Sequence, residues 1–289
     1  MAPASLRALL GGLIDYAGLF PPAALPLVDV VRNYGAYRES ADSWALGRLV
    51  VPAARLAELL ELVPVGEQPW PLTVLVGEDV TADARRILSG QGDARVSIDA
   101  AEVRASTPDE VRSAARALSG VPMVYVELPM YDDPWALIRA VADARARAKI
   151  RTGGITAEVF PSATECARFI AECAETDVAF KATAGLHHPL HGTFPLTYAD
   201  DAPRGEMFGF LNVFVAGAFA RRGMKAQSLA QVLMERDIGR FEFHDTGAAW
   251  RGHTLSVEDI EAARNSFAIS FGSCSFREPI DALTQFGLL

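Results

Sequence analysis

Two short β-like runs on either side of one helical segment most constrain how this chain can fold. The first run is AKIRTGG and ends at Gly154, and the second is AFKATAG and ends at Gly185. Residues alternate between apolar and polar or cationic in both runs, and successive side chains of a strand point to opposite faces. A strand-helix-strand unit of this size makes its two strands parallel neighbours, with the helix covering the apolar face. Lys149, Arg151 and Lys181 are therefore expected to converge on the other face.

The alternation of strand and helix continues along most of the chain. The patterns predict strands near residues 46–51, 72–76, 94–99, 123–128, 148–154, 179–185, 241–244 and 268–271, with helical segments between them. Eight strands that alternate with helices in 289 residues most economically form an α/β protein of the (β/α)8 TIM barrel type. An open doubly wound sheet is the alternative, and the absence of a phosphate-cradling glycine motif after a strand weakens it.

We therefore expect a single barrel domain over residues 46–289, with an N-terminal helical leader over residues 1–45 packed on it. The leader contains the segment DYAGLFPPAALP, whose adjacent prolines Pro21 and Pro22 favour extended backbone. This segment could plug one end of the barrel or contact a second copy of the chain. The sequence leaves a homo-oligomer open.

Composition argues against several classes of partner. A net charge of −9 and a pI of about 5.1 disfavour nucleic acid, which requires clustered surface cations. The first residues do not resemble a signal peptide, and the uncharged run 207–220 is too short to cross a bilayer, so no membrane partner is expected. Three cysteines without a disulfide pattern favour a reducing compartment, and we expect a cytoplasmic protein.

The inward faces of three neighbouring strands carry most of the candidate chemistry. In the run MVYVELP, alternation places Glu127 inward, and the two following strands add cationic side chains beside it. Asp99, also inward by alternation, would supply a second carboxylate. The expected neighbourhood consists of Glu127, Lys149, Arg151, Lys181 and Thr183. A purely architectural ion pair of Glu127 with Lys149 or Arg151 is the alternative interpretation.

Two loops complete the predicted site. The connection from residue 185 to 206 has no periodic apolar pattern, is long enough to be a lid or binding loop, and carries His187 and His188. His244, at the end of the strand predicted over 241–244, would point into the same mouth. After the last strand, Gly272 and Ser273 could present backbone N–H groups to an anion.

The two central runs resemble the class I aldolases of the deoxyribose-phosphate aldolase type. AFKATAG is similar to that family's sixth barrel strand, whose lysine forms a Schiff base, and AKIRTGG is similar to its preceding strand. The resemblance implies that Lys181 is the Schiff-base lysine. It covers only the central strands. The family has a second catalytic lysine on strand seven, where the strand predicted here reads FEFHDTG, and an acidic residue on strand four.

These observations favour an enzyme, with three hypotheses for what it does. The first is a lyase or isomerase, without a cofactor, that acts on a small anionic carbonyl compound through Lys181, Lys149, Glu127, His187 and His188. Burial and the neighbouring cations would lower the pKa of Lys181 and keep its amine neutral. Substrate would be held by Arg151, Thr183, Gly272, Ser273 and His244.

The second hypothesis is a metal-dependent barrel hydrolase or lyase that binds a divalent ion such as zinc through His187, His188 and His244. The third is a non-catalytic barrel whose cationic interior captures an anion.

Overall fold

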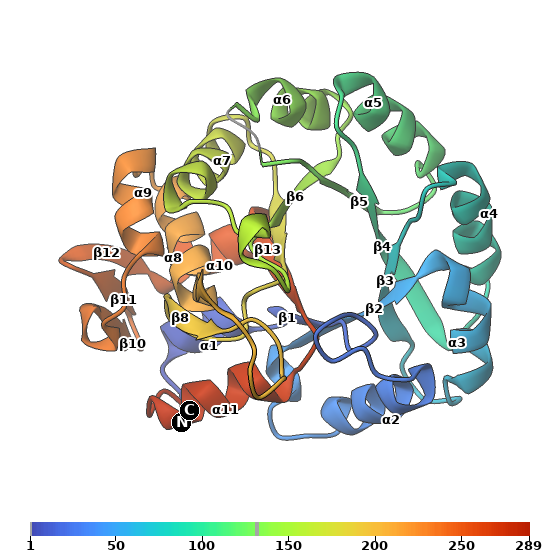
Figure 1. The fold of residues 1–289 in the computed structure, drawn as a ribbon, viewed down its shortest axis with the longest axis horizontal. Helices are drawn as coiled ribbons and strands as arrows, with labels where there is room; N and C mark the ends of the chain where they lie inside the picture. Colours follow the sequence, from blue (N-terminus) through green and yellow to red (C-terminus); the bar gives the residue numbers. More distant parts are fainter. Residues whose placement is uncertain (1, 131–132) are drawn as a thin grey trace.

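The chain folds into a closed ring of eight parallel strands surrounded by helices (Figure 1). The computed structural model describes residues 2–130 and 133–289. The ring runs in the order β1 (Ile14–Tyr16), β2 (Leu46–Pro52), β3 (Trp70–Leu75), β4 (Val96–Arg104), β5 (Met123–Glu127), β6 (Arg147–Arg151), β7 (Phe180–Thr183) and β13 (Ala268–Ser273), and β13 pairs with β1. This closure confirms the predicted (β/α)8 barrel and rules out the open sheet.

Helices cover the outside of the ring and connect most of its strands (Figure 1). They are α1 (Ala4–Leu10), α2 (Leu27–Arg38), α3 (Leu56–Leu62), α4 (Val80–Gly90), α5 (Pro108–Ala117), α6 (Trp135–Asp143), α7 (Ala163–Glu175), α8 (Phe210–Arg221), α9 (Ala226–Leu233), α10 (Val257–Ser266) and α11 (Arg277–Gln285). Side-chain caps fix where several of them begin. Ser162 and Glu165 form a capping box at α7, and Thr107 accepts the Glu110 N–H at α5.

The first barrel strand lies inside the segment that was expected to be only a helical leader. Residues 14–16 form β1, which pairs with β13 on one side and β2 on the other. The barrel therefore begins at Ile14, and the predicted boundary at residue 46 is wrong. With only three residues and an acidic centre at Asp15, β1 gives almost no periodic signal.

The strand predicted over 241–244 does exist, but it is not part of the barrel. It is β10 (Phe241–His244), which forms an antiparallel sheet with β11 (Gly247–Trp250) and β12 (His253–Ser256) outside the ring (Figure 1). Two-residue turns join these strands, and in the second turn Arg251 and Gly252 both have positive φ. That geometry is typical of a hairpin turn, which connects antiparallel strands.

Helix α8 is buried along almost its whole length between the barrel and other helices. It contacts β13, α7, α9 and α10, and its residues 210–220 are buried. A helix that is apolar on all sides is expected in such a position. At Gly217 the approach is so close that an added Cβ would lie 2.8 Å from Cβ of Ala268 on β13. The absent side chain allows α8 to pack directly on the barrel.

We expect Gly217→Ala to destabilise the protein by about 1–3 kcal/mol, since the new methyl group overpacks the contact with β13. Gly35→Ala on α2 is the matched control, because its Cβ would meet only the Trp70 ring at 3.6 Å, an ordinary contact. There, alanine should stabilise the helix by about 0.5–1 kcal/mol. Urea unfolding of both variants measures the difference. Equal effects of the same sign would contradict the close packing of α8.

Candidate functional site

The expected row of charged side chains on β5, β6 and β7 is present inside the barrel. Lys149 is the register partner of Glu127 on one side and of Lys181 on the other. Arg151 and Thr183 are register partners one layer nearer to the C-terminal ends of the same strands. The predicted convergence of these side chains is confirmed.

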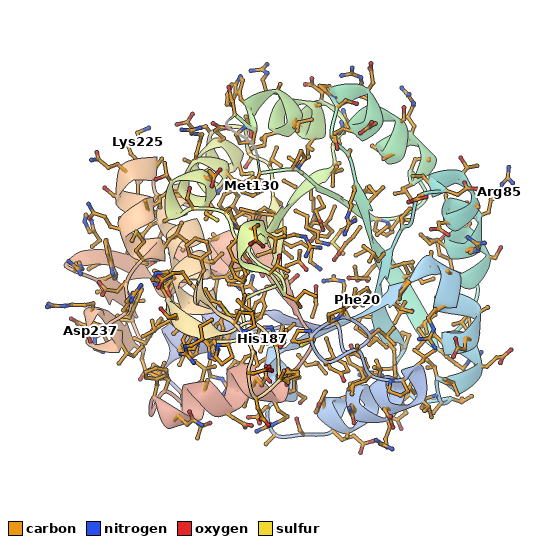
Figure 2. All side chains as sticks on the ribbon, in the orientation of Figure 1. Phe20, Arg85, Met130, His187, Lys225 and Asp237 are labelled. Atoms are coloured by element: carbon orange, nitrogen blue, oxygen red, sulfur yellow. The ribbon has the colours of Figure 1, made fainter. Side chains whose placement is uncertain are left out.

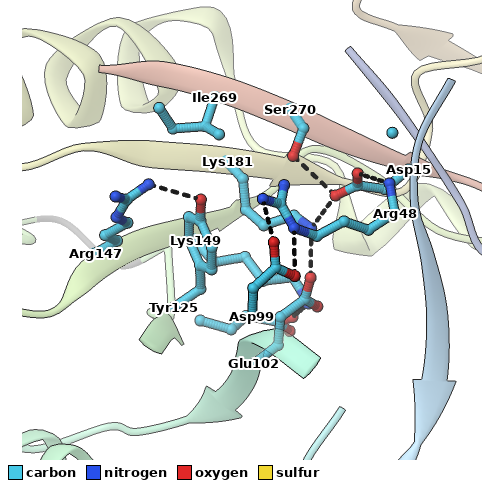
Figure 3. A network of polar contacts seen from close by, with 12 residues as sticks. Asp15, Arg48, Asp99, Glu102, Tyr125, Arg147, Lys149, Lys181, Ile269 and Ser270 are labelled. Carbon is cyan, nitrogen blue, oxygen red and sulfur yellow. Dashed lines mark hydrogen bonds and ion pairs between the residues drawn. The ribbon is translucent and has the colours of Figure 1, made fainter. Parts of the chain in front are cut away.

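Glu102, on β4, links the two lysines across the barrel interior (Figure 3). Its Oε2 accepts from Lys149 Nζ at 2.6 Å, and its Oε1 lies 2.5 Å from Lys181 Nζ. Lys149 Nζ also lies 2.7 Å from Oε2 of Glu127. Glu102 therefore binds the amines of both lysines, whereas Glu127 binds the amine of Lys149 and not that of Lys181.

Asp15, on β1, is the second partner of Lys181 (Figure 3). Its Oδ2 accepts from Lys181 Nζ at 2.6 Å and from the Ser270 hydroxyl at 2.8 Å. Its Oδ1 accepts from the backbone N–H of Arg48 at 2.8 Å. The side chains of Lys181 and Asp15 are 1% and 0% exposed, so this pair is closed off from solvent.

These contacts set the protonation states of Lys181 and Glu102. Burial alone would lower the pKa of Lys181, but the carboxylates of Asp15 and Glu102 outweigh burial and raise it. Burial alone would raise the pKa of Glu102, but the ammonium groups of Lys149 and Lys181 outweigh it and lower that pKa to about 2. The expected lowering of the pKa of Lys181 is therefore wrong, because Asp15 and Glu102 stabilise its charged form.

A cavity of about 630 Å³ opens above this network at the C-terminal ends of the strands. Lys149 and Glu102 line its floor, whereas Lys181 lies beneath and does not line it. Thr183 and Gly272, two of the predicted substrate-binding residues, also line the cavity. Ser273 does not line the cavity, and its hydroxyl donates to the carbonyl of Ser275 at 2.7 Å.

Two guanidinium groups stand in one wall of the cavity. Arg151 Nε donates to Glu127 Oε1 at 3.1 Å, and Arg104 Nε lies 3.4 Å from the same oxygen. Burial would raise the pKa of Glu127, but Lys149 and Arg151 outweigh it and hold that pKa below its ordinary value. Glu127 is therefore an ionised acceptor shared by three cations.

The histidine-bearing loop lies over the mouth, as expected. His187 and His188 both line the cavity, and in Figure 2 Phe20 and His187 lie within the ring of helices. His187 Nδ1 lies 2.8 Å from Oε2 of Glu278 on α11, so Glu278 engages Nδ1 and not the second ring nitrogen, Nε2. His188 stacks on Phe194, and burial, followed by the charge of His187, lowers its pKa to about 4. His188 is thus neutral at pH 7.

The same loop holds a short hairpin, β8 (Gly192–Pro195) with β9 (Arg204–Met207), and Tyr198 at its tip reaches the mouth. The Tyr198 hydroxyl contacts Cys274 Sγ at 3.5 Å and hydrogen bonds to Glu278. Burial raises the pKa of Cys274, so its thiol is protonated at neutral pH.

His244 does not face the cavity. It lies on β10, its side chain is 63% exposed, and its ring contacts Glu242 at 3.5 Å. In Figure 2, Asp237, which precedes β10, lies outside the ring of helices. The proposed set of His187, His188 and His244 is therefore not brought together. Within residues 2–130 and 133–289, no group of three or more His, Cys, Asp or Glu side chains is arranged to hold a metal ion.

Four residues of the site were missed in the sequence: Asp15, Glu102, Arg104 and Glu278. Glu102 and Arg104 lie beyond the strand predicted near 94–99, because β4 continues to Arg104 and contains a bulge. Asp99 is an extra residue in β4, since Ile98 pairs with Leu72 and Ala100 with the next residue of β3. A bulge reverses the alternation that follows it. Asp99 does lie inward, where it binds Arg48 at 3.0–3.1 Å, but Glu102 is inward as well.

No protein-family model, curated protein or solved structure matches this chain. The described part of the chain contains no helix with the length and apolar character needed to cross a membrane.

We expect Glu102→Gln to destabilise the protein by about 3–5 kcal/mol, because two buried ammonium groups lose their shared carboxylate. Urea unfolding monitored by circular dichroism measures the change. Glu58→Gln is the control, since it breaks an exposed ion pair with Arg55 and should leave the unfolding midpoint almost unchanged. Similar midpoints for the two variants would show that the bridge is not structurally important.

The lowered pKa of Glu102 predicts how stability depends on pH. Its pKa is about 2 in the folded chain against 4.5 ordinarily, so between these values only the unfolded state binds the proton. The stabilisation from ionised Glu102 is complete above about pH 4.5 and is lost as the pH falls through about 2. The free energy of unfolding should therefore fall from pH 5 to pH 3 more steeply in the wild type than in Glu102→Gln. Equal slopes would contradict this assignment.

Proposed function

We propose that the protein is an enzyme of the lyase or isomerase type that forms an imine between Lys149 and a small anionic carbonyl compound. The observation that carries the proposal is the position of Lys149 on the floor of the cavity, joined through Glu102 to a second, enclosed lysine. Imine formation needs an amine that a carbonyl carbon can reach, and Lys149 lines the cavity.

The use of lysine in this chain supports an amine-specific role. Of the 27 lysine and arginine residues in the chain, only three are lysines. Two of the three, Lys149 and Lys181, are buried in the barrel, and Lys225 is exposed. Arginine forms ion pairs at least as well as lysine, but its guanidinium does not act as an amine nucleophile. A purely architectural network would not need lysine at the cavity floor.

The resemblance to aldolases of the deoxyribose-phosphate aldolase type favours the same lysine once the strands are counted from β1. Lys149 then lies on the sixth strand of the barrel, Lys181 on the seventh and Glu102 on the fourth. Those are the strands on which the family carries its Schiff-base lysine, its second lysine and its acidic residue. We therefore assign the imine to Lys149 and not to Lys181.

The neighbouring groups suit each step of this chemistry. The neutral amine of Lys149 adds to the carbonyl carbon, and water then leaves as the imine forms. Glu127 Oε2, 2.7 Å from Lys149 Nζ, is placed to accept the proton that the ammonium must first lose. Lys181 keeps its proton between Asp15 and Glu102 and so acts as a fixed positive charge beneath the amine.

A histidine at the mouth can then move protons to and from the carbon atoms of the substrate. His187 is oriented by Glu278 through Nδ1, and a histidine held in this way by a carboxylate is a suitable general base. Electron withdrawal by the protonated imine facilitates cleavage of an adjacent C–H or C–C bond. Cleavage of the C–H bond leads to isomerisation, and cleavage of the C–C bond gives a lyase.

Incubation with small aldehydes and 2-oxo acids, followed by borohydride reduction and peptide mass spectrometry, should place an adduct on Lys149. Exposed Lys225 reports non-specific modification within the same sample. Lys149→Arg keeps the positive charge and should abolish the adduct, whereas Lys225→Arg should not affect it. Modification confined to Lys225, or no adduct across the panel, would refute the imine mechanism.

A further inference from the structure

The two sides of the cavity differ sharply in chemistry. Among the described residues that line it, those contributed by the first three strands and their loops are all apolar: Ala17, Phe20, Pro21, Pro22, Val50 and Leu75. The side formed by β4 and β6 instead carries Arg104 and Arg151. In the ring of eight strands, β5 lies between β4 and β6 and four positions from β1. The loop that carries Phe20 therefore lies across the barrel from the two arginines.

The arginine side has spare positive charge. Arg104 and Arg151 share a single carboxylate oxygen, Oε1 of Glu127. The other oxygen of Glu127 is taken by Lys149, and both oxygens of Glu102 are taken by the lysines. A guanidinium has five N–H donors, and the contacts of Arg104 and Arg151 within residues 2–130 and 133–289 use few of them. An anion in the cavity would find unused donors from both side chains.

The anion site lies close to the reactive amine. Arg151 is two residues beyond Lys149 on β6, so both side chains point inward, with Cα atoms roughly 6.6 Å apart. The two side chains bind the two oxygens of one carboxylate, that of Glu127. A ligand carboxylate bound at Arg151 would therefore lie only a bond or two from a carbon that Lys149 attacks. This spacing fits a carboxylate attached directly to the carbonyl carbon.

We propose that the substrate is a 2-oxo carboxylic acid with an apolar side chain, and that Arg104 and Arg151 bind its carboxylate while the wall around Phe20 and Leu75 holds the side chain. This inference rests on the proposed function for the identity of the carbonyl, but the binding site itself is independent of imine formation. A volume of about 630 Å³ leaves room for a ring or branched alkyl group beyond the acid.

Binding of compounds without a carbonyl group tests the site apart from the chemistry. Isothermal titration calorimetry with 3-phenylpropanoate, 3-phenylpropan-1-ol and acetate should show that only the first binds appreciably. The Arg104→Gln/Arg151→Gln variant should bind 3-phenylpropanoate at least tenfold more weakly. Arg112→Gln, on the exposed face of α5, is the matched control and should bind it as the wild type does. Lys149→Met should retain binding even if no imine can form.

Phe20→Ala tests the apolar wall. Because Phe20 lies in a loop, the substitution should weaken the binding of 3-phenylpropanoate at least threefold without changing the melting temperature. Binding of the alcohol as tightly as the acid would overturn the carboxylate site. Binding of acetate as tightly as 3-phenylpropanoate would overturn the apolar wall. The proposed function fails on a different result, the absence of a borohydride adduct at Lys149, so the two failures are distinguishable.

Discussion

The carboxylate of Glu102, bound by an ammonium group on each of its two oxygens, is the interaction on which the rest of the site depends. From it, charges alternate in sign in both directions: through Lys181 to Asp15, and through Lys149 to Glu127 and Arg151. Buried charges are tolerated when each has partners of opposite sign. These residues come from five strands, and β4 and β7 are not neighbours in the ring. Only the closed barrel brings them together, so the network and the fold require each other.

The sequence predicted the barrel and the central strands well, because β5, β6 and β7 alternate regularly and are long enough for the period to be visible. It did not predict the anions on which the lysines depend. Asp15 lies in a three-residue strand without a detectable period, and the bulge at Asp99 reverses the alternation along β4, which turns Glu102 inward. Without those anions, burial and the neighbouring cations predict a lowered pKa and a neutral Lys181, whereas in the structure the pKa of Lys181 is raised.

Because β1 gives no signal in the sequence, the predicted numbering of the strands from β2 to β7 is one too low. A segment outside the barrel, β10, was then needed to complete the count of eight, which placed His244 at the mouth. The two-residue connections after β10 and β11 are incompatible with a barrel strand at 241–244, since parallel strands need much longer crossovers. The prediction that His187 and His188 lie at the mouth is confirmed, because a long loop that follows a barrel strand runs over the C-terminal end of the barrel.

Exposure rises steadily along the chain of charges, from Asp15 and Lys181 through Glu102, Lys149 and Glu127 to Arg151, whose side chain is 35% exposed. The closed end is held fixed, whereas the open end can respond to a ligand. An anion that binds Arg151 competes with Glu127 for the same guanidinium. Weaker pairing raises the proton affinity of Glu127, which makes it a better acceptor for the proton of Lys149. On the proposed function, arrival of an anionic substrate would thus help to produce the neutral amine that attacks it.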